Sequence, residues 1–225
     1  MINEVDMGMT GTLPCLNKRG VEFAIRVCHA LHMEIDELLC FDRKNYYYSD
    51  LPKGFQITQD KRPIGRNGYL MIEVDGEEKR IDIERLHMEE DTAKQLHLTD
   101  YSLIDYNRAG IPLIEIVTKP CIRSGKEASA YLEALRQVFL YTEVSDAKLE
   151  EGSMRCDVNV SIRPFGQEAF GTRTEIKNLN SISNVQKAID YEAGRQQEVI
   201  ESGGEVLQET RRYDEVEKIT TVMRS

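Results

Sequence analysis

A run of carboxylates is the part of this chain best suited to chemistry. Glu89 and Glu90 belong to the segment RLHMEED at 85–91, where three acidic residues follow a basic residue and a histidine. Upstream, residues 69–84 alternate around Asp75-Gly76, a dipeptide that takes the positive φ angles of a tight hairpin turn. We therefore expect the acidic run to follow the end of a strand. There it could hold a hard cation or a phosphate-bearing substrate, although charge runs more often face water.

A further carboxylate, Glu115, interrupts the apolar segment IPLIEIV at 111–117, and this segment predicts a buried strand. A glutamate is costly to bury unless it is paired or bound to a metal. Two structural alternatives stay open, because Glu115 can face water on a one-sided sheet or pair with a nearby Arg or Lys.

The segment MRCDVNVSI at 154–162 alternates cleanly, so Arg155, Asp157 and Asn159 share one face of a predicted strand. That face is either solvated, as is common in antiparallel sheets, or lines a cleft. In a cleft, Arg155 suits a phosphate, and Asp157 or Asn159 suits a metal.

Residues 41–57 mix three tyrosines with Arg43, Lys44 and Lys53, and they are predicted to form a loop. The mixture favours a surface that contacts an anion or a nucleotide. The alternative is that the rings belong to the core while the cations face solvent. Residues 92–107 are polar and are also predicted to form a loop.

Capping residues mark three predicted helices. Asn17 opens a helix to about residue 33, Ser124 opens one to about residue 141, and Ser181 or Ser183 opens a long one that ends at Gly203-Gly204.

Further strands are predicted at 172–180 and 208–214. Strands, hairpins and helices in this irregular order predict an α+β fold, mainly an antiparallel sheet with flanking helices. No glycine-rich phosphate loop is present, so a nucleotide would be held by carboxylates, a metal and cations.

Composition sets outer bounds. The 225 residues are 40% hydrophobic and 30% charged, as in ordinary globular proteins, and no apolar run is long enough to span a membrane. The five cysteines are scattered, which favours neither a disulfide framework nor a zinc site and makes the cytoplasm the expected location. A net charge of −10 argues against nucleic-acid binding by this segment alone, although local basic patches are possible.

Six blocks carry a resemblance that extends from about residue 11 to residue 224. They are FDRKNY at 41–46, RLHMEED at 85–91, NRAGIPLIEIV at 107–117, EEGSMRCDVNVS at 150–161, EIKNLNS at 175–181 and QETRRYD at 208–214. Their sequence and order resemble the signature blocks of the B subunits of aspartyl/glutamyl-tRNA amidotransferases.

The resemblance implies a glutamine-dependent carbon–nitrogen ligase, a heterotrimer in which the B subunit joins an amidase and a small third protein, the C subunit. The amidase releases ammonia from glutamine. The B subunit uses ATP and Mg²⁺ to phosphorylate the side-chain carboxylate of misacylated Glu-tRNA(Gln) or Asp-tRNA(Asn), and ammonia arriving through a channel displaces the phosphate. The implied catalytic domain is similar to the glutamine synthetase fold.

The resemblance also assigns roles to residues of this chain. They are metal ligands (Glu89, Glu90, Glu115), catalytic residues (Glu90, Glu115, Asp157, Arg155) and ATP-binding residues (Lys44, Lys53, Arg155). The two lysines and Glu90 are also candidates for the ammonia channel or its gate.

The sequence departs from the family pattern in two places. It lacks the Gly-Leu-Glu-Val-His motif whose Glu and His complete the family's metal site, and it lacks the helical domain and the tail domain that binds tRNA. We therefore expect a single catalytic domain over 1–225, truncated at both ends, inactive alone and reached by tRNA through the complete protein. Two alternatives are the archaeal-type E subunit of the tRNA(Gln) amidotransferase and a non-catalytic fragment that only docks on the amidase.

Overall fold

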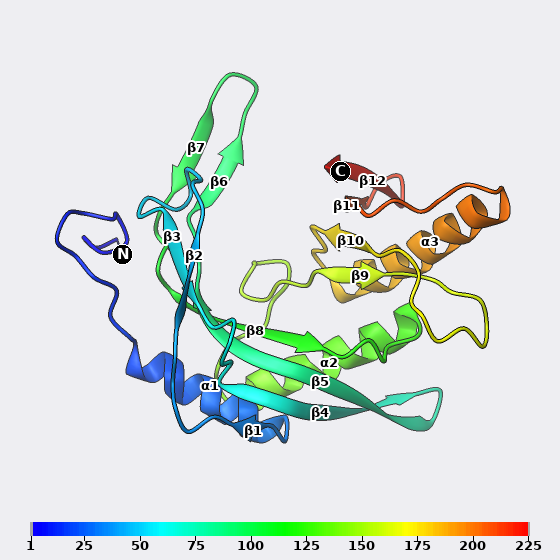
Figure 1. Cartoon of the computed structure of the whole chain (residues 1–225), viewed down its shortest axis with the longest axis horizontal. Coiled ribbons are helices and arrows are strands. Elements are labelled where there is room, and N and C mark those ends of the chain that lie inside the picture. Colours follow the sequence, from blue (N-terminus) through cyan, green and yellow to red (C-terminus); the bar gives the residue numbers. More distant parts are fainter. Residues whose placement is uncertain (1, 225) are drawn as a thin grey trace. The chain divides into compact units, whose positions relative to one another are not determined.

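The computed structural model describes residues 2–224, which form three α-helices and twelve β-strands (Figure 1). Helices and strands are both present, so the described chain is a mixed α and β protein, as expected. Most of its strand pairs are antiparallel. It divides into two compact units. Unit 1 holds the residues up to Leu70 and Asp82–Pro120, and unit 2 holds Met71–Ile81 and the residues from Cys121 onward. The expectation of a single domain stays a prediction.

Unit 1 contains one helix and most of the strands. In chain order these elements are α1 (Lys18–Ala30), β1 (Glu34–Ile35), β2 (Asp42–Asn45), β3 (Phe55–Thr58), β4 (Gly65–Val74), β5 (Glu77–Glu90), β6 (Lys94–His97), β7 (Ser102–Asp105) and β8 (Pro112–Thr118). The main sheet has the strand order β1-β4-β5-β8, and the tip of its β4–β5 hairpin is assigned to unit 2. β2 pairs with β3, and β6 pairs with β7, each as a separate two-stranded sheet.

Helix α1 begins where its capping residue predicts. The side chain of Asn17 accepts a hydrogen bond from the backbone N–H of Gly20 at 3.1 Å. A side chain at Gly20 would place its Cβ 3.0 Å from Cβ of Pro112, so glycine allows α1 to approach β8 closely. The helix ends at Ala30, before the predicted residue 33, because the chain turns through His32 with a positive φ of 54°.

The predicted β4–β5 hairpin is confirmed, with φ of 58° at Asp75 and 82° at Gly76. The expectation that the acidic run follows the end of a strand is wrong for its first two glutamates, because β5 continues through Glu90. Side chains from β3 and the residue after it extend the strand. Gln59 accepts from the Met88 N–H at 3.0 Å, and Gln56 donates to the Glu90 carbonyl at 2.7 Å.

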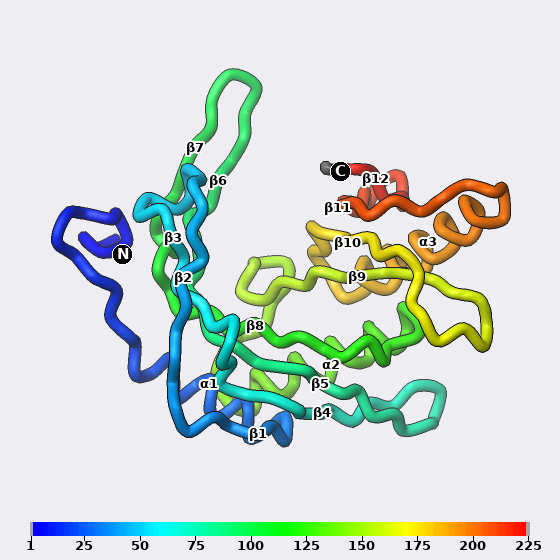
Figure 2. Tube along the Cα trace, in the orientation of Figure 1, coloured from blue at the N-terminus to red at the C-terminus, as the bar shows by residue number. Residues whose placement is uncertain are grey.

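Both predicted loops instead contain hairpins, β2–β3 over 42–58 and β6–β7 within 92–107. Strands β2, β6 and β7 are largely exposed, and β3 buries the polar residues Gln56 and Thr58, so none of them shows the apolar alternation that marks a strand on a core. The hairpins lie side by side (Figure 2), since Ser49 Oγ lies 3.0 Å from Gln95 Oε1 and Tyr106 Oη donates to the Ser49 carbonyl at 2.8 Å.

Strand β8 forms where predicted, but the expectation that it is buried is wrong. Its residues are exposed or half-buried, and the side chain of Glu115 is 50% exposed. The first structural alternative, a one-sided sheet, describes this strand better than burial does.

Unit 2 contains two long helices and one sheet. Its elements are α2 (Gly125–Tyr141), β9 (Val158–Val160), β10 (Thr174–Lys177), α3 (Ile182–Glu201), β11 (Thr210–Asp214) and β12 (Ile219–Arg224). Ser124 and Ser181 cap α2 and α3 as predicted. The strand expected over 154–162 is confirmed only for β9. The sheet order is β12-β11-β10-β9, with β10 and β11 parallel across the α3 connection. In the part of the chain that the structure describes, no helix combines the length and apolar character needed to cross a membrane.

A buried carboxylate ties this sheet to α3. Glu192 is 0% exposed and accepts hydrogen bonds from Thr174 Oγ1 on β10 and Thr220 Oγ1 on β12, each at 2.8 Å. Arg195 donates to both carboxylate oxygens at 2.9 and 2.6 Å, and Arg211 Nε on β11 lies 3.4 Å away. A buried carboxylate with this many donors is strongly stabilised in its charged form.

We expect Glu192→Gln to destabilise the protein by about 3 kcal/mol at neutral pH, because Arg211 and Arg195 lose a buried counter-charge. Burial raises the pKa of Glu192, but the hydrogen bonds, led by those from Arg195, outweigh it and hold the pKa at about 2, below the ordinary 4.5. The stabilisation is therefore present above pH 4.5 and is lost as the pH falls towards 2.

Thermal unfolding followed by circular dichroism between pH 7 and pH 2 measures this effect. The matched control is Glu198→Gln, an exposed position on the same helix, which should track the parent protein. Equal loss of stability in the two variants at neutral pH would contradict the assigned role.

Candidate functional site

The pairing of β5 with β8 brings together residues that are distant in the sequence. His87 lies directly opposite Glu115 in the register, and Glu89 follows His87 on the same face of β5 because side chains alternate along a strand. Nε2 of His87 lies 3.7 Å from a carboxylate oxygen of Glu89 and 4.0 Å from one of Glu115. One ligand atom from each residue lies within 4.8 Å of the other two. We call these three residues the β5–β8 triad.

The triad has an unbalanced charge. Among the described residues, neither Glu89 nor Glu115 pairs with a lysine or an arginine, and His87 is the only basic group near either. Burial and then the carboxylates of Asp50, Glu89 and other acidic neighbours raise the pKa of Tyr46. The surroundings of the triad therefore favour a cation.

His87 is the member that the sequence interpretation missed. Its side chain is only 7% exposed, and its Nδ1 is buried without a hydrogen-bond partner in the described part of the chain. The nitrogen that lies near the two carboxylates is Nε2, so Nε2 is the atom that could join them in binding a cation. The spacing of His87 and Glu89, two residues apart, was the signal that could have found it had the strand been predicted to continue through Glu90.

The donor set fits a divalent cation. Carboxylate oxygens such as those of Glu89 and Glu115 are the usual protein ligands of Mg²⁺, which keeps several waters and needs few protein donors. An imidazole nitrogen also suits ions such as Mn²⁺ and Zn²⁺. The structure thus brings together two of the three predicted metal ligands, with His87 beside them.

Glu90, the third predicted ligand, lies elsewhere. Its carboxylate is 2.6 Å from the ammonium of Lys53 and accepts the backbone N–H of Ile57 at 2.7 Å. The side chains of Lys53 and Glu90 are only 6% and 13% exposed. The pair is a buried tether between β5 and the β2–β3 hairpin, and the metal-binding role of Glu90 stays a prediction.

The two predicted ATP-binding lysines have different surroundings. Lys44 is exposed on β2, with its ammonium 5.7 Å from the centre of the Tyr46 ring. Lys53 is buried against Glu90. Only Lys44 is therefore exposed and available to an incoming anion.

Arg155 and Asp157 belong to unit 2, just before β9, and both are exposed. Asp157 accepts a hydrogen bond from Lys177 at 2.9 Å, and Lys177 also lies 3.2 Å from Glu175. Burial lowers the pKa of Lys177, but the bonds to Asp157 and Glu175 outweigh it and raise the pKa. Asp157, Lys177 and Glu175 therefore form a small charged network on this sheet, and the phosphate-binding and catalytic roles of Arg155 and Asp157 stay predictions.

Comparison with known proteins decides the family. The family described as the GatB/GatE catalytic domain matches residues 1–225. The chain belongs to this family. The resemblance of its six sequence blocks to the amidotransferase B subunits is thereby confirmed.

Curated relatives of the same family are closely similar. A protein of Mesoplasma florum, named as the B subunit of the aspartyl/glutamyl-tRNA(Asn/Gln) amidotransferase, is 58% identical over 224 residues, which is 100% of this chain and 47% of the relative. A protein of the same name from Staphylococcus aureus strain MRSA252 is 59% identical over 222 residues, which is 99% of this chain and 47% of the relative. The chain spans about half the length of these relatives.

We expect Lys53→Ala to destabilise the chain by about 3–5 kcal/mol, because it leaves the Glu90 carboxylate buried without its counter-charge. Lys53→Met combined with Glu90→Gln should cost much less, since neither charge then remains. Urea unfolding of the parent, the Lys53→Ala variant and the double variant measures the difference. Lys44→Ala is the control, with an expected change below about 0.5 kcal/mol at an exposed site. An Ala variant at position 53 as stable as the control would show that the pair is not a tether.

Proposed function

We propose that this chain is the part of a tRNA-dependent amidotransferase B subunit that activates a carboxylate with ATP. In the proposed reaction, an oxygen of the side-chain carboxylate of misacylated Glu-tRNA(Gln) or Asp-tRNA(Asn) accepts the γ-phosphoryl group of ATP, which leaves ADP. Ammonia from glutamine then displaces inorganic phosphate and forms the amide. The observation that supports this most is the β5–β8 triad, a cation-binding donor set in a chain that belongs to the GatB/GatE catalytic domain family.

The triad suits the first step. The reaction joins two anions, a carboxylate and a triphosphate, and a divalent cation would neutralise their repulsion. Glu89 and Glu115 would hold Mg²⁺, with His87 beside them. Because Glu115 is half exposed while His87 and Glu89 are nearly buried, the donor set is open to solvent on the β8 side.

The remaining predicted residues have supporting parts in this proposal. Lys44 is exposed and would contact the phosphates of ATP. Lys53 would do so only if its pair with Glu90 opened, which makes the pair a candidate gate for ammonia. In unit 2, Arg155 keeps its proposed phosphate-binding and catalytic roles, and Asp157 keeps its proposed catalytic role.

The wider assembly also belongs to the proposal. The relatives are named as B subunits, which supports association with an amidase and with a small C subunit. The cytoplasm, where ATP and tRNA are used in translation, is the proposed location. The mainly antiparallel sheets with flanking helices support the proposed likeness to the glutamine synthetase fold.

Two alternatives differ in what they predict. The quoted relatives carry the name of the B subunit, which favours that role over the archaeal-type E subunit. A fragment that only docks on the amidase would have no use for an uncompensated carboxylate pair, and it would not bind ATP.

We expect the chain to bind ATP in a manner that depends on Mg²⁺ or Mn²⁺, and we expect Glu115→Gln and Glu89→Gln each to weaken this binding at least about tenfold. The physical reason is the loss of one of two charged oxygen ligands. Isothermal calorimetry with ATP, with and without the metal, measures the effect.

The matched control is Glu84→Gln. Glu84 lies on β5, as Glu89 does, and its side chain is 53% exposed, against 50% for Glu115. This control should bind as the parent does. Cation-independent binding, or equal binding by all four proteins, would refute the triad as the metal site. No binding by the parent would favour the docking fragment.

A further inference from the structure

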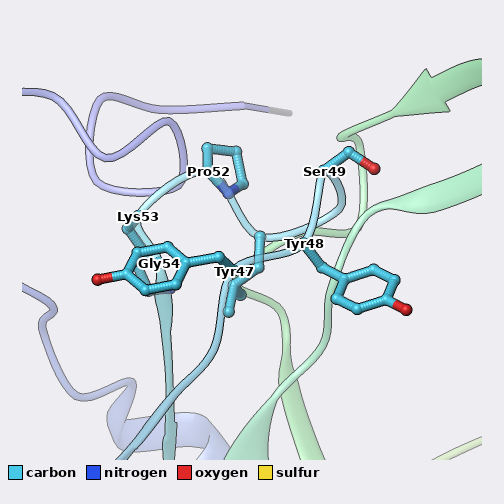
Figure 3. A pocket seen from close by; sticks show the side chains of 7 residues that line it. Tyr47, Tyr48, Ser49, Pro52, Lys53 and Gly54 are labelled. Carbon is cyan, nitrogen blue, oxygen red and sulfur yellow. The ribbon is translucent and has the colours of Figure 1, made fainter.

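The loop that joins β2 to β3 presents two tyrosine rings to solvent. Tyr47 is 91% exposed and Tyr48 is 65% exposed. They border an open hollow of about 360 Å³ (Figure 3), whose other lining residues are Ser49, Leu51, Pro52, Lys53 and Gly54. In Figure 3 the two rings extend in different directions from the loop, and the Tyr47 ring lies across Gly54. Large aromatic side chains exposed to this extent commonly mark a binding surface.

Backbone hydrogen bonds and one buried side chain hold the backbone of this loop in place. Gly54 has a φ of +74°, which favours glycine, and a Cβ there would lie 3.1 Å from Cε1 of Tyr47. The N–H of Tyr46 donates to the Gly54 carbonyl at 3.2 Å, and the N–H of Leu51 donates to the Tyr48 carbonyl at 3.0 Å. Leu51 is 5% exposed and anchors the loop. A loop backbone ordered in advance loses little freedom when it binds a partner.

Uncompensated positive charge lies at the base of this loop. Arg43 and Lys44 are exposed on β2, and in the described chain neither forms an ion pair. Both cations lie over aromatic rings instead: the Arg43 guanidinium is 4.3 Å from the centre of the Phe55 ring, and the Lys44 ammonium is 5.7 Å from that of the Tyr46 ring. Exposed rings beside unpaired cations suit single-stranded nucleic acid, whose bases stack and whose phosphates are anionic.

The loop is connected to the triad by one short strand. Thr58, at the end of β3, lies with its hydroxyl 3.5 Å from the Glu89 carboxylate. Gly54, at the edge of the hollow, is four residues earlier, which is about 13 Å at roughly 3.3 Å per residue. In an aminoacyl-tRNA the reacting amino acid is esterified to the terminal ribose of an unpaired 3′ end. A loop joined to the triad by so short a strand is within reach of the bases next to that ribose.

We propose that Tyr47 and Tyr48 are a stacking site for the unpaired 3′-terminal bases of the aminoacyl-tRNA substrate, which deepens the proposed function and rests on it. Each ring would stack one base, and Arg43 would meet the adjoining phosphate. A protein partner could also use exposed tyrosines. The two unpaired cations on the same hairpin favour RNA, and the protein alternative is one outcome of the test.

The test uses the chain with a fluorescently labelled CCA trinucleotide RNA, measured by anisotropy. Base–aromatic stacking is worth about 1–3 kcal/mol per base, so Tyr47→Ala should weaken binding by about fivefold to a hundredfold, and Tyr48→Ala similarly. Tyr47→Phe keeps the ring and should bind as the parent does. The matched control is Tyr141→Ala, because Tyr141 at the end of α2 is 88% exposed and lies in unit 2.

The proposal is supported if the alanine variants at 47 and 48 lose affinity while Tyr47→Phe and Tyr141→Ala keep it. It is overturned if the parent binds no trinucleotide, or if all variants bind equally. It is also overturned if the alanine variants keep RNA binding but lose association with an amidase. Calorimetry with ATP separates this result from the proposed function, since failure of the triad would abolish cation-dependent ATP binding and leave the tyrosine-dependent RNA binding in place.

Discussion

The register between β5 and β8 is the constraint on which the candidate site depends. It sets His87 opposite Glu115 and leaves Glu89 on the same face. A slip of one residue would turn this face over and direct the apolar side chains of Leu86 and Met88 to where the triad now lies. Those two residues are 0% and 3% exposed, so burying them fixes the register. The core thus determines the geometry of the polar site.

The same strand needs a second partner near its end. A strand edge with unpaired N–H and C=O groups is a liability unless something covers it. Here Gln59 and Gln56 bond the backbone of β5 at Met88 and Glu90. Because Gln56 is part of β3, these bonds also fix the β2–β3 hairpin beside the triad. The same hydrogen bonds therefore satisfy the backbone of β5 and position the loop that carries Tyr47 and Tyr48.

The sequence was most informative where local chemistry decides the structure. Asn17, Ser124 and Ser181 capped helices because a side-chain oxygen meets nearby N–H groups whatever the rest of the fold does. The turn at Asp75-Gly76 was predictable for the same reason. Tertiary contacts were harder to foresee. Strands β2, β6 and β7 are largely exposed, and β3 buries the polar residues Gln56 and Thr58, so their segments resembled loops. Membership of His87 in the candidate site depends on its pairing with Glu115 on another strand, which only the register between the two strands can confirm.

Adjacent glutamates with opposite surroundings explain how the site can be both stable and open to a cation. Glu90 is neutralised by Lys53 and holds the hairpin, whereas Glu89 has no lysine or arginine partner among the described residues. Two neighbouring uncompensated carboxylates, Glu89 and Glu115, would repel each other and destabilise the strand pair at neutral pH. The strand pair tolerates them because the hydrophobic face and the Lys53 tether supply the stability. A cation bound at the triad as proposed would therefore not be needed to hold β5 against β8, and the fold should be equally stable with and without added Mg²⁺.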